Sequence, residues 1–137
     1  LVVDIPGELN LEDYGIHNSN VNTISLISPT TKRNRIESIA KNSTGFVYYV
    51  TLRGVTGASN LDVDEISNNV QEIKKYASVP TLAGFGIKSA EDAKLLAECS
   101  DGIIIGSSIV QMIEESSKLK EFDRIKEYIS EIKKAIS

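Results

Sequence analysis

The sequence predicts a parallel α/β fold built from consecutive strand–helix units. Short runs rich in Val and Ile alternate with longer amphipathic stretches along the whole chain. The connections between these runs are too long for hairpins, so neighbouring strands should be parallel, with a helix in each crossover. The runs are also nearly continuously apolar, which is typical of strands covered on both faces.

Five strands are predicted, each from one short apolar run. They are residues 1–5, 23–28, 45–51, 81–83 and 102–105. Pro6 ends the first strand and Pro29 the second, because proline has no N–H to donate to a ladder. The third strand is followed by a Gly-rich polar loop, and the fourth runs into the triplet GFG.

Helices are predicted between and after these strands. The expected ranges are 9–18 (weak), from Thr30 or Thr31 to about Asn42, 63–76, 89–98, 107–114 and 122–136. The clearest is 63–76, because its apolar residues recur at spacings of three and four and share one face. Ser89 and Asp92 have the spacing of a capping box. The last helix carries its isoleucines on one side and many Lys and Glu residues on the other.

Composition excludes several classes of protein. The 137 residues are 41% hydrophobic, enough for one core, and no apolar run approaches the roughly 20 residues of a membrane span. A net charge of -4 disfavours nucleic acid, which needs a basic face. Cys99 is the single cysteine, so an internal disulfide is excluded and a reducing, cytoplasmic setting is expected. The start LVVDIP lacks a Met and a signal-peptide pattern, and we expect the chain to be a piece of something longer.

Glycines cluster where the predicted strands end. Ligands of parallel α/β folds lie at the carboxyl ends of the strands, and three of the five ends are Gly-rich: residues 51–57, 84–86 and 106–108. Glycine lets a ligand approach backbone N–H groups, and the helix start at Ser107 offers unpaired donors. A single GxG would be a common turn, but three such ends and a short extra helix favour a phosphate site.

Three longer motifs carry a family resemblance. GFVYYVTLRGVTGA, PTLAGFGIKSAEDAKLL and DGIIIGSSIVQMI, in this order and spacing, resemble the alpha subunit of tryptophan synthase, and VVDIP and SPTT fit the same family. The resemblance implies a (β/α) barrel of the TIM type that cleaves indole-3-glycerol phosphate to indole and glyceraldehyde 3-phosphate in tryptophan biosynthesis. It implies neither metal nor cofactor in this subunit, and a partner beta subunit that holds pyridoxal phosphate and receives the indole.

The resemblance covers about strands four to eight, that is, the C-terminal part of one barrel domain. A full barrel has about 250 residues, so roughly 110 would lie on the N-terminal side. In the family the catalytic glutamate is on the second strand and the catalytic aspartate on the loop after it, and neither has a counterpart here. The chain alone is therefore expected to be inactive and to self-associate, flatten into an open sheet, or require the missing half-barrel.

The resemblance also implies roles for particular residues. Those matching the phosphate site are Gly57, Gly86, Gly106 and Ser107. Those matching the substrate pocket are Phe85, Ile104 and Thr56, of which Phe85 and Ile104 could equally be core. Tyr48 matches a tyrosine that assists the proton chemistry; strand side chains alternate, so only Tyr48 or Tyr49 can face the pocket, and we favour Tyr48. Asp4 stands at a strand end where the family has an aspartate, and its role stays open.

Two other functions remain compatible with these residues. One is another phosphate-binding barrel enzyme, such as a sugar-phosphate isomerase or epimerase. The other is a non-catalytic barrel fragment that folds and at most binds phosphate. GVTG together with the tyrosine of the third predicted strand favours the tryptophan synthase interpretation.

Overall fold

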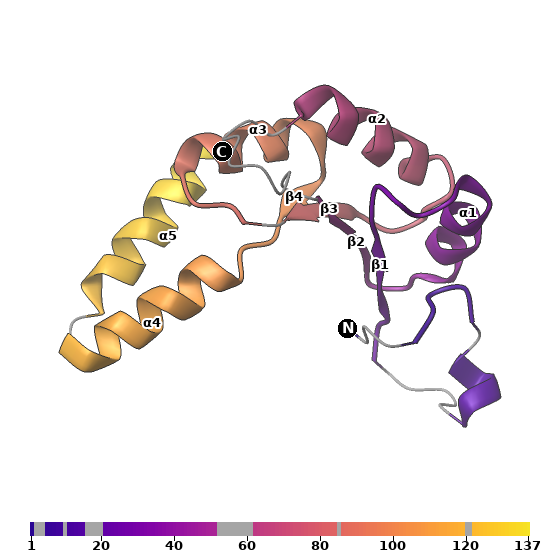
Figure 1. Ribbon diagram of the computed structural model, residues 1–137, viewed down its shortest axis with the longest axis horizontal. Coiled ribbons are helices and arrows are strands. Elements are labelled where there is room, and N and C mark those ends of the chain that lie inside the picture. Colours follow the sequence, from indigo (N-terminus) through magenta and orange to yellow (C-terminus); the bar gives the residue numbers. More distant parts are fainter. Residues whose placement is uncertain (2–4, 10, 16–20, 52–61, 85, 120–121) are drawn as a thin grey trace.

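A four-stranded parallel sheet forms the centre of the molecule (Figure 1, a computed structural model). The structure describes residues 1, 5–9, 11–15, 21–51, 62–84, 86–119 and 122–137. The strands are β1 (Ile24–Ile27), β2 (Phe46–Val50), β3 (Thr81–Gly84) and β4 (Gly102–Ile103), and they lie in the order β1-β2-β3-β4. All three neighbouring pairs are parallel, which confirms the predicted fold class.

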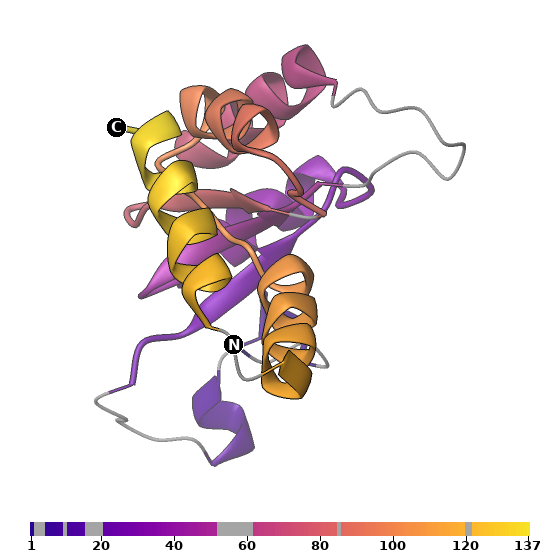
Figure 2. The same ribbon diagram turned by 90° about the vertical axis from the view of Figure 1, so that its left-hand side faces the viewer.

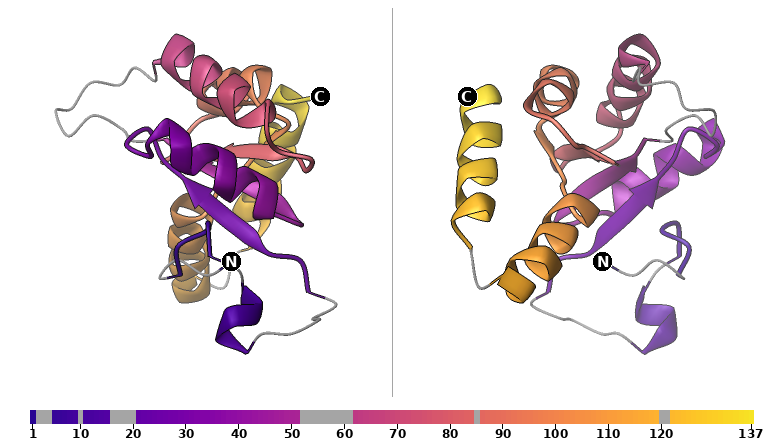
Figure 3. Two further views of the ribbon diagram at one scale, coloured as in Figure 1. Left: turned by 90° about the vertical axis from the view of Figure 1, so that its right-hand side faces the viewer. Right: turned by 60° about the vertical axis from the view of Figure 1, so that its left-hand side comes forward.

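Helices connect the strands and follow the last one. They are α1 (Arg33–Asn42), α2 (Val63–Lys74), α3 (Ala90–Cys99), α4 (Ser107–Leu119) and α5 (Asp123–Ala135), and a short 3₁₀ helix, η1 (Leu11–Tyr14), precedes β1. Figure 3 (right) shows α1, α2, α3 and α5 standing in an arc around one side of the strands. Figures 1 and 2 show α4 and α5 as a helical hairpin that extends beyond the sheet.

The strand order makes this a piece of a barrel rather than a doubly wound sheet. Strands follow one another in space as they do in sequence, and each crossover helix packs on the same face. Because parallel crossovers share one hand, an unbroken order curves the sheet in one direction. The chain is thus a partial parallel (β/α) barrel, and the open sheet with helices on both sides is not the arrangement of the described elements.

The two faces of the sheet differ in burial. One face packs against the helices, and its side chains are at most 2% exposed: Ile27, Val47, Tyr49, Thr81 and Ala83. The opposite face carries Leu26, Tyr48 and Leu82 side by side in register, and all three are partly exposed. In a closed barrel this second face is the interior.

A single apolar core lies between the sheet and the helices. Each helix contributes residues from one stripe: Ile36, Ile39 and Ala40 from α1, Ile66, Val70 and Ile73 from α2, Ala93 and Leu96 from α3, and Ile132 from α5. The helix predicted over 63–76 from apolar spacings of three and four therefore does bury one face, through its central apolar residues. In the last helix Ile132 is buried, whereas Phe122 and Ile129 are about half exposed, so this helix contributes less to the core than α2 does. No helix in the described ranges is long and apolar enough to cross a membrane.

Helix starts show where local signals succeed and fail. The capping box before α3 is confirmed: the Ser89 hydroxyl accepts from the Asp92 N–H at 3.1 Å, and the Asp92 carboxylate accepts from the Ser89 N–H at 3.3 Å. The predicted threonine cap of α1 is wrong. Lys32 holds the N-cap position without a side-chain bond, because the Thr31 hydroxyl accepts instead from the Ser28 N–H at 3.0 Å.

Other predicted boundaries change as well. Helix α4 runs past Glu114 to Leu119, since the pairs Glu114–Lys118 at 2.8 Å and Gln111–Glu115 at 3.1 Å support a further turn. Strand β4 is shorter than 102–105, although the Ile104 N–H still donates to the Ala83 carbonyl at 2.9 Å. The weak helix over 9–18 is a short 3₁₀ turn in its described part. The predicted first strand, residues 1–5, has its central residues 2–4 outside the described residues.

One ion-paired carboxylate ties the amino-terminal edge of the sheet together. Asp101, just before β4, accepts from the Thr81 N–H at 2.8 Å and from Lys74 Nζ at 2.6 Å. Partial burial opposes the ionisation of Asp101, but the Lys74 and Thr81 hydrogen bonds outweigh it and hold the pKa of Asp101 below its ordinary value. This edge is opposite to the one where a ligand is expected.

Asp101→Ala should lower the free energy of unfolding by about 1–2 kcal/mol at neutral pH, because the buried Thr81 N–H loses its acceptor. The folded-state pKa of Asp101 is depressed, so its stabilisation is complete above the unfolded-state pKa and is lost as the pH falls through the folded value. Urea unfolding at neutral and acid pH measures the difference. Glu114→Gln, in a pair that is 70% exposed, should have little effect at either pH.

Candidate functional site

The carboxyl ends of β3 and β4 bring the predicted glycine-rich segments to one edge of the sheet. Gly86 follows β3 with a positive φ of 62°, a backbone conformation that favours glycine. Gly106 follows the β4 segment and directly precedes α4, and Ser107 is the first residue of that helix. Gly106 and Ser107 are exposed and Gly86 is partly exposed, so a ligand can approach all three.

A close backbone approach holds the two strand ends together. A Cβ atom on Gly84 would clash with the Ile104 carbonyl oxygen and would lie 2.9 Å from the Ile104 Cβ. Only glycine leaves room for this approach. Ile103 packs against the core, and its neighbour Ile104 lies beside Gly84 and is partly exposed. Ile104 therefore lies at the carboxyl edge next to the end of β3, and its role as a pocket residue stays a prediction.

The start of α4 presents unpaired backbone donors. The Val110 N–H donates to the Gly106 carbonyl at 3.1 Å, which makes it the first N–H bonded within the helix. The preceding N–H groups have no partner inside the helix and lie at the positive end of its dipole. A Cβ on Gly106 would meet nothing within 4 Å, so open space adjoins these donors. Such an end can bind an anionic oxygen group.

The neighbouring tyrosines of β2 face opposite sides of the sheet. Tyr49 is 1% exposed, and its hydroxyl accepts from Asn69 Nδ2 of α2 at 2.9 Å. Burial raises the pKa of Tyr49 to about 12. Tyr48 lies on the uncovered face beside Leu82, and burial raises its pKa as well. Both phenols are thus neutral donors near neutral pH, and only Tyr48 is on the interior face; its assisting role stays a prediction.

Four of the residues singled out from the sequence lie outside the described residues. They are Asp4, Thr56, Gly57 and Phe85. The described structure brings together Gly86, Gly106, Ser107 and Ile104 at one edge. Tyr48 is on β2, two residues before the level at which Val50 pairs with Gly84.

The sequence interpretation missed two residues of this edge. Gly84 was assigned no role, although it sets the distance between the ends of β3 and β4. The sequence also predicts no role for Ser108. Its hydroxyl donates to the Ile87 carbonyl at 2.6 Å and joins α4 to the segment after β3. The GFG triplet could have indicated a close approach at Gly84, whereas nothing local marks Ser108.

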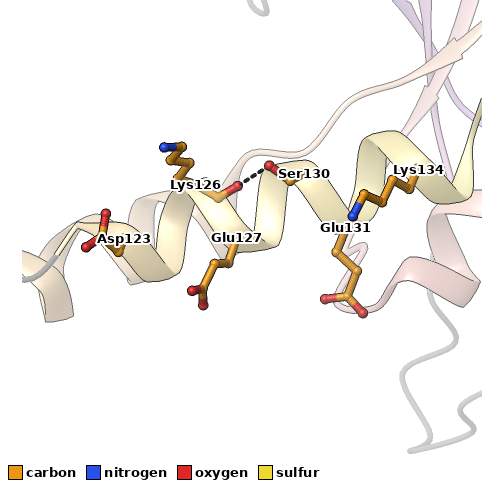
Figure 4. A pocket seen from close by; sticks show the side chains of 6 residues that line it. All are labelled: Asp123, Lys126, Glu127, Ser130, Glu131 and Lys134. Carbon is orange, nitrogen blue, oxygen red and sulfur yellow. Dashed lines mark hydrogen bonds between the residues drawn. The ribbon is translucent and has the colours of Figure 1, made fainter.

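A metal-binding cluster and a surface depression are two other kinds of site to consider among the described residues. Within the described ranges, no group of three or more His, Cys, Asp or Glu residues is arranged to hold a metal ion. A shallow depression runs along α5, lined by Asp123, Lys126, Glu127, Ser130, Glu131 and Lys134 (Figure 4). All six come from one helix. The Ser130 hydroxyl already donates its proton to the Lys126 carbonyl, at 2.7 Å. This depression is the solvated face predicted for the last helix.

Comparison with known proteins assigns the family. The family model described as tryptophan synthase alpha chain matches residues 1–137. The chain belongs to the tryptophan synthase alpha chain family. A tryptophan synthase alpha chain of Janthinobacterium sp. (strain Marseille) is 40% identical over 138 residues, which cover 99% of this chain and 52% of the relative. The chain thus spans about half the length of this relative.

Solved structures agree with this assignment. Tryptophan synthase subunit alpha from Legionella pneumophila str. Paris matches with a TM-score of 0.77 and 29% identity, over 98% of this chain and 50% of that one. The subunit alpha from Campylobacter jejuni matches with a TM-score of 0.69 and 31% identity, over 89% of this chain and 46% of that one. The family and the partial-barrel fold predicted from the sequence are therefore confirmed.

Gly84→Ala tests the close approach that shapes this edge. The added methyl group must push the β4 segment away, so the free energy of unfolding should fall by about 1–3 kcal/mol. Gly106→Ala is the matched control, because its Cβ enters open space and should change stability by less than about 0.5 kcal/mol. Urea unfolding of both variants makes the comparison. Equal stability of the two would mean that the ends of β3 and β4 can separate freely.

Proposed function

We propose that this chain forms the phosphate-binding part of a tryptophan synthase alpha chain that cleaves indole-3-glycerol phosphate to indole and glyceraldehyde 3-phosphate. The observation that carries the proposal is the pairing of Gly86 with the Gly106–Ser107 helix start at one sheet edge. Membership in the family supports this substrate rather than another sugar phosphate. The catalytic carboxylates and the remaining strands of the barrel would come from an N-terminal half.

Backbone groups are proposed to hold the substrate phosphate. The N–H groups at Gly86, Gly106 and Ser107 lie at the edge described above, and Gly57 would join them from the loop after β2. A phosphate at the start of α4 gains from the unpaired donors and from the helix dipole. Backbone binding of this kind suits an acidic chain, with a net charge of -4, because it needs no cluster of basic side chains.

The reaction itself requires two coordinated proton transfers. The bond between the indole ring carbon and the first glycerol carbon breaks, the ring carbon receives a proton, and the hydroxyl on the glycerol carbon loses one as it becomes the aldehyde. Positioned acids and bases contribute about 10²–10⁴-fold each to such steps. Tyr48 would assist as a neutral donor on the interior face, since burial keeps its phenol protonated. Ile104, Phe85 and Thr56 would line the space for the indole.

The proposed partner is the tryptophan synthase beta subunit. Pyridoxal phosphate would belong to that subunit, and the alpha chain would need no cofactor because cleavage involves only proton transfer. Indole would leave the alpha site as an uncharged product. A partner that consumes indole would shift the equilibrium of the cleavage toward products.

Release of indole from indole-3-glycerol phosphate tests the proposal. The whole protein, with the N-terminal half of the barrel present, should catalyse it, and the 137-residue chain alone should not, because both proposed carboxylates are elsewhere. Gly106→Val should raise KM at least about tenfold, since a branched side chain would occupy the space beside the helix start. Robust turnover by the 137-residue chain alone, abolished by Asp4→Asn, would contradict the assignment of the catalytic groups.

Replacing Tyr48 or Tyr49 singly by phenylalanine tests which face of the sheet meets the substrate. Tyr48→Phe in the whole protein should lower kcat for indole release by about tenfold or more with little change in stability. Tyr49→Phe should leave kcat nearly unchanged and lower stability by about 1 kcal/mol, because the Asn69 amide loses its acceptor. Steady-state kinetics and urea unfolding distinguish them. The reverse pattern would place the substrate on the other side of the sheet.

A further inference from the structure

One hydrogen bond joins the two segments that are proposed to hold the phosphate. Ser108, the second residue of α4, donates its hydroxyl proton to the Ile87 carbonyl at 2.6 Å. Ser108 adjoins Ser107, and Ile87 adjoins Gly86, so the bond spans the two binding segments. Ser108 is partly buried and Ile87 is 2% exposed, which shields the bond from water.

The segment around Ile87 is also held from its other side. The Asp92 carboxylate of α3 accepts from the Lys88 N–H at 3.1 Å and from the Ser89 N–H at 3.3 Å. These bonds fix the end of the segment that leads into α3, but they do not reach α4. Among the described residues, the bond from the Ser108 hydroxyl to the Ile87 carbonyl is the one that joins the segment next to Gly86 to the start of α4.

We propose that Ser108 is a positioning residue of the phosphate site. Through the Ile87 carbonyl it holds the Gly86 segment at the distance from α4 at which both present N–H groups to one phosphate. This inference rests on the proposed function, because it takes the phosphate-bearing substrate as given. It adds Ser108 to the residues of the proposed site, as a side chain that positions the Gly86 segment and does not itself contact the ligand.

The chemistry of the hydroxyl separates positioning from direct binding. A serine hydroxyl has one proton to donate, and at Ser108 that proton goes to the Ile87 carbonyl. A phosphate dianion accepts hydrogen bonds, so the Ser108 hydroxyl cannot donate to it at the same time. Removing the hydroxyl leaves the Ile87 carbonyl without this donor and lets the Gly86 segment move relative to α4.

Titration with inorganic phosphate, followed by the amide shifts of Gly86 and Ser107 in the whole protein, tests the role. Ser108→Ala should weaken phosphate binding roughly three- to tenfold, the loss expected when one buried hydrogen bond no longer orders the site. Ser108→Thr keeps the hydroxyl and should restore the affinity. If the alanine variant does not fold, Ser108→Cys should give an intermediate loss, because a thiol is a weak donor.

Ser100→Ala is the matched control. Ser100 is also partly buried, and its hydroxyl lies within hydrogen-bond distance of two backbone carbonyls, those of Leu96 at 2.7 Å and Gly102 at 2.8 Å, but it lies before β4 at the opposite edge. The Ser100→Ala variant should have a lower free energy of unfolding than the unchanged protein but the same affinity for phosphate. Unchanged affinity in Ser108→Ala, or an equal loss in Ser100→Ala, would overturn the role of Ser108. Absence of any phosphate-dependent shift in the unchanged protein would overturn the site itself, and the role of Ser108 with it.

Discussion

Coverage of the sheet by helices on one face only is the constraint on which the rest of the structure depends. In β2 the side chains alternate between the core and the open face, and the paired residues of β1 and β3 lie on the matching faces, so register and burial are fixed together. Val47 and Tyr49 are almost fully buried, whereas Tyr48 between them is partly exposed. The open face and the carboxyl edge are then free to serve as the interior and the mouth of a barrel.

The mouth depends on backbone geometry more than on charged side chains. Gly84 allows the end of β3 to approach Ile104, Gly86 adopts a positive φ, and Ser108 joins the two segments through a carbonyl. In the proposed function, a site assembled in this way would bind an anion by oriented N–H groups. Its affinity would then depend on small shifts between the segments, so that residues outside direct contact would matter.

Much of the fold could be predicted from local sequence signals. Helix α2 follows from its apolar spacing, and the start of α3 follows from Ser89 and Asp92, because both signals act within one turn. The start of α1 could not be predicted, since Thr31 had a competing partner in the Ser28 N–H. The roles of Gly84 and Ser108 depend on partners about 20 residues away, so no local pattern reveals them.

The family resemblance adds what periodicity cannot, namely which residues at the strand ends are predicted to contact the substrate. The described structure supports the placement of Gly86, Gly106 and Ser107 at one edge and of Tyr48 on the open face. It also shows that apolar residues of α4 and α5, such as Val110 and Ile129, are exposed. Both features are expected of a barrel segment that packs against further strands and helices.

The most direct test of the account is a crystal structure of the whole protein with a non-cleavable analogue of indole-3-glycerol phosphate that lacks the glycerol hydroxyl groups. The account predicts phosphate oxygens within hydrogen-bond distance of the N–H groups at Gly86 and Ser107. It also predicts the indole on the side of the sheet that carries Tyr48. A phosphate bound by side chains elsewhere, or an indole on the side of Tyr49 and Asn69, would contradict it.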